Sequence, residues 1–540
     1  MKDKRERQNI PGIQREPLEW NYRSSKKYSD PFNDVDLDVI VSAPDGDKYR
    51  IPCFWAGKNE WRARFAAPKP GSYQLESVCS DKINHSLHGK KAILKISPYK
   101  GKNLLLKHGN LRVADSKRTF EHEDGTPFFW LGDTWWLALS KRMSWPTDFK
   151  QLTADRVRKG FSVIQIVAGI YPDMDSFDKR GENEAGFPWE KNYSRINPAY
   201  FDKADQRIGW LVQQGLVPCI VGCWGYYLAK LGTEKLKKHW RYLIARWSAY
   251  PVVWCAAGEA EMPYYLSKDK DADRKTQHEG WTELVKYIRN TDPVKHMVTI
   301  HPTRIGRNQI ADDSLLDFDM LQTGHSGYET VPYTVKTVIE ERKRQPHMPV
   351  LVGEVNYEGI FHHSHEDVQR LTFWSALLSG TAGHTYGANG IWQVNTEKDP
   401  YGPSPHGGNW GITPWQEASR LPGSFQLGLA RKFLSRYEWW KFEPRQDWVT
   451  PPGTPEKQDL PFAAGIPGVV RIIYIYNPPT PWAEPMMVSS LSTRIQYNAF
   501  FWDPRTGKKY EIEKIKPDSA GSWKIPIVPY FKDWVVVIEE

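Results

Sequence analysis

The sequence predicts an α/β protein, namely a (β/α)8 barrel (TIM barrel) flanked by a β-sandwich domain at each end. Within residues 99–448, eight short apolar segments alternate with longer stretches of helical periodicity, which is typical of parallel strands joined by helices. Residues 1–98 and 449–540 instead contain short segments of alternating polarity separated by turns, which indicates antiparallel sandwiches. A chain of 540 residues can hold a barrel of about 250 residues or more together with two smaller domains.

The amino-terminal region, residues 1–98, is predicted to be an immunoglobulin-like β-sandwich. Five segments alternate apolar and polar residues with a period of two, over residues 34–44, 48–57, 60–68, 71–80 and 92–99. Turn-forming residues such as Pro44-Asp45-Gly46 and Pro70-Gly71 separate them. Because no cluster of acids or histidines occurs here, we expect this region to support the barrel rather than to catalyse.

The central region, residues 99–448, is predicted to form the barrel. Its apolar segments are FFWLGDTWW, FSVIQIVAG, VPCIVGCWG, VVWCAAGEAE, HMVTIHP, FDMLQTGHS, PVLVGEVNY and GHTYGANG. Helical periodicity separates most of them, for example over residues 147–160, 198–215, 233–250 and 365–380, and only the unit after the fifth segment is poor in helix. The alternative is an open doubly wound sheet, which would need a glycine-rich phosphate loop where this chain has LGDTWW.

The carboxy-terminal region, residues 449–540, is predicted to be a second β-sandwich. Its candidate strands cover residues 468–478, 494–504, 508–515, 521–528 and 533–540. The turn-rich stretch Pro451-Pro452-Gly453 marks its start. This region also lacks paired acids, so we expect a supporting role for it as well.

Composition excludes several classes of protein. The chain is 40% hydrophobic and 25% charged, as a globular protein is, and it contains no apolar run of about 18 residues that could span a membrane. The net charge is +9, but the basic residues are dispersed and no reader motif accompanies them, so we expect no nucleic-acid partner. The 25 tryptophans make flat, ring-shaped ligands such as sugars the class to test.

Cysteine usage and the amino terminus bear on the cellular compartment. Five cysteines are too few for a disulfide framework, and we expect buried, reduced thiols. Cys219 and Cys223 have a C-x3-C spacing, but no second pair of metal ligands follows. The start, MKDKRERQNI, lacks the apolar core of a secretory signal, which predicts a cytoplasmic location unless a leader has been removed. The oligomeric state stays open, and an oligomer is compatible with the sequence.

Polar and aromatic residues end most of the predicted strands, at the level where a barrel carries its chemistry. One such residue alone is usually structural, but apolar strands that each end in an acid, amide, imidazole or aromatic residue would line one common substrate site. The candidates include Asp133, Trp135, Trp136, Gln165, Trp224, Glu259, Glu261, His301, Gln322, His325, Glu354, Tyr357, His384, Tyr386 and Trp392.

The sharpest feature of this set is the pair Glu259 and Glu354. Each follows an apolar strand and a glycine, in CAAGE and VLVGE. Carboxylates after the fourth and seventh strands would face each other across the barrel, and two opposed carboxylates are what glycoside hydrolysis requires. The alternative is a pair of buried structural glutamates, which costs free energy without any catalytic return. Glu261 competes with Glu259 for the fourth-strand role, because it lies on the same side if the strand continues.

Metal-dependent catalysis is the weaker alternative. A metallohydrolase barrel usually carries an H-x-H pair on its first strand, where this chain offers only Asp133. His362, His363 and His365 fall in the loop that precedes a helix after the seventh strand. We therefore predict no metal and no other cofactor.

Three motifs resemble the apiosidase-like glycoside hydrolases, which are distant relatives of the clan A retaining barrel enzymes. These motifs are FFWLGDTWW, GEAE after VVW, and PVLVGEVNYEG. The flanks agree, since the amino-terminal region resembles the β-sandwich that often precedes such barrels. The segment FFWDPRTGK resembles the small collagen-binding-type β-domain that often follows them. The resemblance covers most of the chain and is most specific at the first and seventh strands.

The resemblance implies an acid/base after the fourth strand and a nucleophile after the seventh, which are Glu259 and Glu354 here. It also implies that Asp133 binds substrate hydroxyls. Many clan A enzymes have Asn immediately before the fourth-strand acid, where it contacts the sugar 2-hydroxyl, whereas this chain has Gly258. Either another residue makes that contact or the sugar differs, so the best-known activity of the family does not transfer directly.

The expected function is therefore that of a retaining, exo-acting glycoside hydrolase whose partner is a carbohydrate, a plant or microbial oligosaccharide. Two alternatives stay open, a non-catalytic glycan-binding protein and an inverting or metal-dependent carbohydrate-active enzyme. The separation of the two carboxyl groups discriminates between the mechanisms, since about 5–5.5 Å favours retention and about 6.5–9.5 Å favours inversion.

Overall fold

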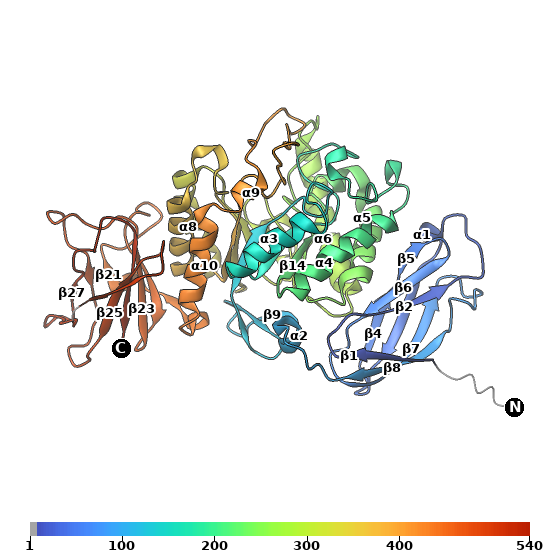
Figure 1. Cartoon of the computed structure of the whole chain (residues 1–540), viewed down its shortest axis with the longest axis horizontal. Coiled ribbons are helices and arrows are strands. Elements are labelled where there is room, and N and C mark those ends of the chain that lie inside the picture. The colour runs from blue at the N-terminus through green and yellow to red at the C-terminus, as the bar shows by residue number, and fades with distance from the viewer. Residues whose placement is uncertain (1–7, 513) are drawn as a thin grey trace.

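A computed structural model describes residues 8–512 and 514–540 of the chain. A β-sandwich, an α/β barrel and a second β-rich unit follow one another along the long axis of the molecule (Figure 1). The prediction about a secretory signal rested on residues 1–10, and residues 1–7 of that segment lie outside the described residues.

The amino-terminal region contains two facing sheets and two strands that the sequence analysis did not identify. The sheet orders are β1-β8-β7-β3-β4 and β2-β6-β5. The strands are β1 (Gln8–Ile13), β2 (Leu18–Arg23), β3 (Leu37–Ser42), β4 (Lys48–Pro52), β5 (Phe54–Gly57), β6 (Glu60–Phe65), β7 (Gly71–Cys79) and β8 (Lys91–Ser97). Strand β1 escaped detection because it contains Pro11 and Gly12, which strands tolerate mainly at a sheet edge, and β1 is an edge strand here.

The central region forms the predicted barrel, and all eight predicted strands are confirmed. They pair in parallel in the order β16-β15-β14-β13-β12-β19-β18-β17. The gap between β16 and β17 is bridged by the Asp317 amide, which donates to the Val298 carbonyl at 2.9 Å. The strands are β12 (Trp130–Thr134), β13 (Val163–Val167), β14 (Val217–Val221), β15 (Val253–Cys255), β16 (Val298–Thr299), β17 (Asp319–Gln322), β18 (Val350–Glu354) and β19 (Gly383–Tyr386).

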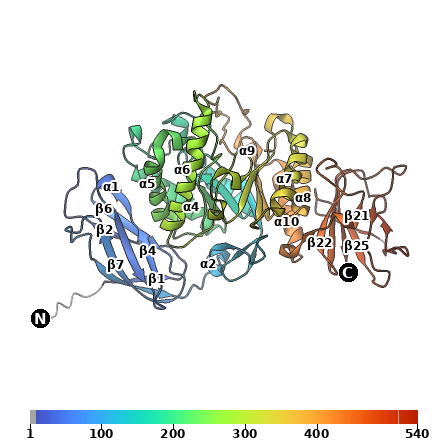
Figure 2. The ribbon, with the colours of Figure 1, turned by 180° about the vertical axis from the view of Figure 1, so that it is seen from behind.

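Helices cover the outside of the barrel in both views (Figures 1 and 2). They are α3 (Thr147–Arg158), α4 (Pro198–Gln213), α5 (Tyr227–Trp247), α6 (Lys270–Thr291), α7 (Val331–Lys343), α8 (Glu366–Leu378) and α10 (Pro422–Leu434). Three short helices are α1 (Pro31–Asp34) in the amino-terminal region, α2 (Leu104–His108) and α9 (Trp415–Ala418). Between β16 and β17 the described chain forms only the 3-10 helices η3 (Gly306–Gln309) and η4 (Asp313–Leu315), so this fifth unit is poor in helix, as predicted. No helix among the described residues has the length and apolar character needed to cross a membrane.

A small sheet closes the amino-terminal end of the barrel. It consists of β9 (Leu111–Val113), β10 (Phe120–His122) and β11 (Pro127–Phe128). The Phe120 ring packs against Trp130 and Phe318, with ring centroids 5.6 and 5.1 Å apart, and Phe120 is fully buried. Side chains therefore fill this end of the barrel.

The carboxy-terminal region is a β-sandwich of a larger and a smaller sheet, ordered β20-β22-β23-β28-β25-β26 and β21-β24-β27. Its strands are β20 (Glu443–Pro444), β21 (Val449–Thr450), β22 (Phe462–Ile466), β23 (Val470–Ile475), β24 (Met487–Val488), β25 (Asn498–Trp502), β26 (Lys509–Ile512), β27 (Trp523–Lys524) and β28 (Trp534–Glu539). All five cysteines of the chain lie elsewhere, and each is buried and unpaired, as predicted.

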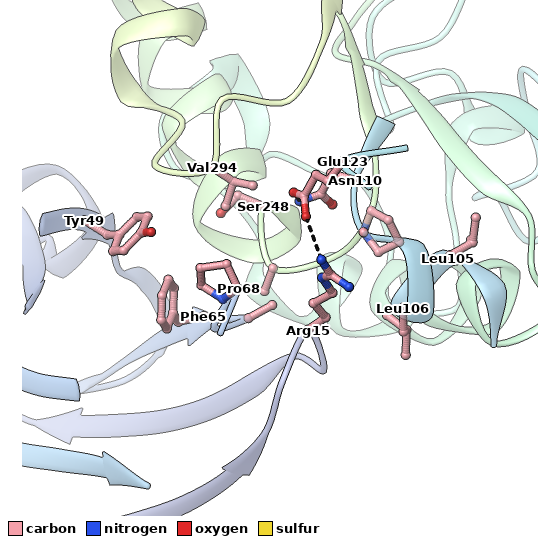
Figure 3. A pocket seen from close by; sticks show the side chains of 14 residues that line it. Arg15, Tyr49, Phe65, Pro68, Leu105, Leu106, Asn110, Glu123, Ser248 and Val294 are labelled. Atoms are coloured by element: carbon pink, nitrogen blue, oxygen red, sulfur yellow. Dashed lines mark hydrogen bonds and ion pairs between the residues drawn. The ribbon is translucent and has the colours of Figure 1, made fainter. Parts of the chain in front are cut away.

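Buried ion pairs attach both flanking regions to the barrel. On one side Arg64 of β6 lies 2.6 Å from Asp205 of α4. On the other, Arg370 of α8 makes a two-pronged contact with Asp533, at 2.6 and 2.9 Å. Figure 3 shows the amino-terminal junction, where Arg15 reaches Glu123 at 3.3 Å beside a cavity of about 170 Å³.

Candidate active site

A cavity of about 260 Å³ opens at the carboxyl ends of the barrel strands. Both glutamates of the predicted pair line it, and seven other predicted site residues line it or contact one of these glutamates. The lining residues are Trp136, Pro172, Asp173, Trp224, Glu259, Met262, Tyr265, Gln322, His325, Glu354, Tyr357, Ile360, Trp392, His406 and Trp410.

Glu259 reaches the cavity through a strained turn after β15. Its φ is 41°, in the left-handed region that non-glycine residues rarely adopt. The preceding Gly258 forms a parallel bridge with Trp224, and a Cβ at position 258 would overlap the Trp224 ring. This packing explains why the residue before Glu259 is glycine in this chain. Trp224 in turn donates from Nε1 to Glu259 Oε2 at 3.2 Å.

Glu354 is the last residue of β18, and two histidines flank its carboxylate. His325 Nε2 lies 2.9 Å from Oε1, and His301 Nε2 lies 3.1 Å from Oε2. Burial alone would raise the pKa of Glu354, but the contacts with His301 and His325 outweigh it and hold that pKa well below its usual range. The same contact with Glu354 outweighs burial at His301 and raises the pKa of that imidazole. Glu354 is therefore an ionised carboxylate at neutral pH.

Gln322 of β17 joins the two glutamates. Its Nε2 donates to Glu259 Oε1 at 2.9 Å and approaches Glu354 Oε1 at 3.3 Å. Two oxygens that share one donor cannot be farther apart than the sum of both distances, so these two lie within about 6 Å of each other. The carboxyl groups of Glu259, after β15, and Glu354, at the end of β18, thus lie next to the same side chain in the cavity.

The surroundings shift the pKa values of the two carboxyl groups in opposite directions. Burial and, next, the negative charge of Glu354 raise the pKa of Glu259 to about 7. Glu259 therefore keeps its proton over the pH range in which Glu354 has lost its own. One protonated and one ionised carboxyl group at the same pH is the arrangement that acid-assisted displacement needs.

Aromatic rings form much of the remaining cavity wall. Trp136, Trp224 and Trp392, three of the four tryptophans predicted here, line the cavity. Trp136 Nε1 donates to the Tyr357 hydroxyl at 3.1 Å, and Tyr357 stacks on Trp392 with ring centroids 6.3 Å apart. Aromatic rings in a cavity wall suit the apolar C–H groups of a sugar.

Several predicted site residues are not brought to the cavity, because the protein itself satisfies or encloses them. Gln165 donates to the Gly353 carbonyl at 3.0 Å, and the Tyr386 hydroxyl donates to Glu358 at 2.5 Å. Burial lowers the pKa of His384 to about 3, so its ring is neutral inside the barrel. The other two, Asp133 and Trp135, hydrogen-bond to each other at 2.7 Å and are fully buried.

Glu261, the competitor for the fourth-strand role, also turns away from the cavity. Strand β15 ends at Cys255 and the chain turns at Glu259, so the alternation that would have placed both acids on one side does not apply. Glu261 instead contacts His278 Nδ1 of α6 at 2.6 Å and Gln309 Nε2 at 3.3 Å. The structure therefore brings Glu259, and not Glu261, to Glu354.

The residues that sequence reasoning missed come from long loops. Pro172 and Asp173 follow β13, Met262 and Tyr265 follow β15, and His406 and Trp410 belong to the segment after β19. These segments have no periodicity, so nothing in the sequence places their side chains over the barrel. Among the described residues, no group of three or more His, Cys, Asp or Glu side chains could hold a metal ion.

Comparisons with known proteins agree with this geometry. Residues 114–441, more than half of the chain, match the family described as "Apiosidase-like, catalytic domain", and residues 14–80 match a "Domain of unknown function (DUF5060)". No match is found among curated proteins.

Similar solved structures share the fold. One, titled "Glycoside hydrolase", is 22% identical, covers 82% of this chain and 99% of its own, and superposes with a TM-score of 0.66. A glycoside hydrolase family 5 protein from Bacteroides vulgatus is 21% identical, with coverages of 82% and 96% and a TM-score of 0.66. A second Bacteroides vulgatus protein, titled provisionally as a glycoside hydrolase, is 16% identical, with coverages of 98% and 100% and a TM-score of 0.72.

Proposed function

The chain belongs to the family of apiosidase-like catalytic domains and is a glycoside hydrolase, and from this premise we propose that it acts with retention of configuration. In this proposal Glu354 is the nucleophile and Glu259 is the general acid/base. The substrate is an oligosaccharide from which one terminal sugar is released.

The opposed pKa shifts of the two glutamates carry the proposal. A retaining enzyme needs an ionised nucleophile and a protonated acid at the same pH. His301 and His325 lower the pKa of Glu354, while burial and the charge of Glu354 raise the pKa of Glu259 to about 7. The environment thus supports these two roles and no exchange of them.

The proposed reaction has two steps. A carboxylate oxygen of Glu354 forms a bond to the anomeric carbon while the glycosidic C–O bond breaks, and Glu259 gives its proton to the departing oxygen. Glu259 is then a carboxylate, and it takes a proton from a water molecule. That water attacks the anomeric carbon, the bond to Glu354 breaks, and the released sugar has its original configuration.

The contact of Gln322 with both glutamates limits their separation, which is more compatible with retention than with inversion. Their facing oxygens lie within about 6 Å because Gln322 contacts both. An inverting enzyme needs room for a water molecule between substrate and base, and its carboxyl groups are about 6.5–9.5 Å apart. Inversion remains the competing mechanism, and product stereochemistry discriminates between the two.

The size and depth of the cavity support exo-action. Its volume of about 260 Å³ is at the lower end of the range for pockets that bury a drug-sized molecule, which suits one or two sugar rings. Glu354, Tyr357 and Trp392 at its floor are all buried. A substrate would therefore insert a chain end rather than thread through an open cleft.

Chemical rescue tests the assignment. On the aryl glycoside that the protein cleaves best, Glu259→Gln should retain measurable activity, because a good leaving group needs little protonation. Added azide should raise its rate and yield a glycosyl azide of retained configuration. Glu354→Gln should be inactive on every substrate. Rescue of only the Glu354 variant, with an inverted azide product, would exchange the roles, and rescue of Glu261→Gln would identify a different acid.

A further inference from the structure

A third carboxylate faces the catalytic cavity and has no part in the two-step reaction. Asp173, in the loop after β13, lines the same cavity as Glu259 and Glu354 and is only 7% exposed. Its Oδ1 accepts a hydrogen bond from the Tyr265 hydroxyl at 2.5 Å. Burying a carboxyl group costs free energy, which Tyr265 offsets in part, and the position of Asp173 in the cavity wall makes it accessible to a ligand.

The backbone at Asp173 is held in a strained conformation. Its φ is 52°, a region that residues other than glycine adopt only at a cost. Two buried tyrosines from other loops fix this segment through its carbonyl groups. The Tyr226 hydroxyl reaches two of them at 3.1 and 3.2 Å, and the Tyr401 hydroxyl reaches two more at 3.1 Å each. Strain that is fixed from two sides in a cavity wall is typical of a functional position.

Asp173 lies on the side of the cavity that carries Glu259, the proposed general acid. Tyr265 comes from the same loop as Glu259, six residues farther along the chain. Its ring packs against His406 with centroids 4.9 Å apart, and His406 is exposed to solvent. Glu354 instead ends β18, in the barrel wall. The pair formed by Asp173 and Tyr265 therefore lies on the side of the cavity whose loop carries Glu259, next to a solvent-exposed residue.

We propose that Asp173 and Tyr265 form the subsite for the leaving group, and that this leaving group is itself a sugar. The inference rests on the proposed roles of the glutamates, because the general acid touches the departing oxygen and whatever lies beyond it binds the departing group. A carboxylate accepts hydrogen bonds from two neighbouring hydroxyls of one sugar ring. An aryl or alkyl leaving group offers no such donors, so this site selects a glycosidic bond between two sugars.

The test compares two substrates that share the glycone. One is the p-nitrophenyl glycoside that the wild-type protein cleaves best, and the other is the same glycone linked to glucose or xylose. Asp173→Asn keeps the shape and tolerates a positive φ. It should lower kcat/KM for the disaccharide by about 10- to 100-fold, the value of hydrogen bonds to a charged group. The loss on the aryl glycoside should stay within about threefold, and Tyr265→Phe should show the same selectivity with a smaller loss.

The same two loops offer a matched control. Asp175, two residues after Asp173, forms a second aspartate–tyrosine pair with Tyr264, which directly precedes Tyr265. Neither residue of this second pair lines the catalytic cavity. Asp175→Asn and Tyr264→Phe should leave both substrates unaffected. Thermal melting of each variant checks that a loss of rate is not a loss of folded protein.

Each outcome decides the matter. Equal losses on both substrates would place Asp173 on the glycone or on the acid, and no loss would remove it from substrate binding, so either result overturns the inference. If the wild-type protein cleaves no glycoside, the proposed function has failed. Saturation-transfer NMR with methyl glucoside and methyl xyloside then still tests the subsite, which requires binding to the wild type that Asp173→Asn weakens. Equal signals from both proteins would overturn it.

Discussion

Asp133 and Glu354 are carboxylates near the carboxyl ends of barrel strands, with exposed fractions of 0% and 5%, yet only Glu354 faces the cavity. Asp133 contacts Arg156 Nε of α3 at 2.6 Å, Trp135 Nε1 at 2.7 Å and its neighbour's amide at 2.9 Å. Glu354 contacts two histidines and a glutamine instead.

The difference lies in the partners. A permanently charged arginine and an indole N–H close off Asp133, and this network ties β12 to the first barrel helix. Imidazole and amide groups stabilise the negative charge of Glu354, and its carboxylate still lines the cavity. In this barrel the carboxylate that an arginine of the next helix reaches is enclosed, and the carboxylate that only histidine and amide side chains contact stays open to the cavity.

The largest effect should come from Glu354→Gln. In the proposed mechanism this change replaces the nucleophilic carboxylate by a neutral amide, so kcat/KM should fall by about 10⁴-fold or more. The free energy of unfolding should change far less, because glutamine keeps the shape and much of the hydrogen bonding. Steady-state kinetics with aryl glycosides and urea unfolding measure both quantities. Residual activity within tenfold of wild type would place the nucleophile elsewhere.

Asp133→Asn should lower the free energy of unfolding much more than it lowers kcat/KM. It removes the fully buried carboxylate partner of the Arg156 guanidinium and leaves only Asp155 beside it, which costs about 1–3 kcal/mol of unfolding free energy. The activity of the remaining folded molecules should stay within severalfold of wild type, because the carboxylate does not line the cavity. Urea unfolding, with rates corrected for the folded fraction, checks this. A normal stability with a strongly raised KM would return Asp133 to substrate binding.

The pH profile sharpens the contrast between the two cavity carboxyl groups. Because Glu259 must be protonated to act as acid, kcat/KM should decline as the pH rises through about 7. The acidic limb, which requires ionised Glu354, should lie below the usual range of a glutamate. In Glu259→Gln, measured with a good leaving group, the decline near pH 7 should vanish. A decline that persists there belongs to another group.

A smaller effect is expected on stability. In the unfolded chain Glu259 titrates near its ordinary value of 4.5, whereas the fold raises its pKa to about 7. The folded state binds more protons between these values, so this group's contribution to stability falls as the pH rises through that window. Glu259→Gln should therefore stabilise the protein by about 1–3 kcal/mol at pH 8 and by much less at pH 4. Thermal melts at both pH values test this, and a variant less stable than wild type at pH 8 would contradict it.

The sequence predicted the barrel well because its strands are continuous apolar runs, such as VIQIV in β13, separated by amphipathic helices. Strand β1 was missed because Pro11 and Gly12 interrupt the alternation. The sequence singled out the pair Glu259 and Glu354 because each directly follows an apolar segment and a glycine. The placement of Asp133 could not be predicted, because its partner Arg156 comes from a helix whose facing residues are fixed only by packing. Asp173 and Tyr265 lie in aperiodic loops, whose path over the barrel depends on contacts such as those of Tyr226 and Tyr401.

The central claim is that Glu354 forms a covalent bond to the sugar. A 2-fluoro derivative of the preferred aryl glycoside slows both steps, and a good leaving group lets the first step proceed, so the intermediate accumulates. Mass spectrometry of the digested protein should then find one added glycosyl group, on the peptide that contains Glu354. Attachment to Glu259 or Glu261, or the absence of any adduct together with an inverted product, would contradict the account.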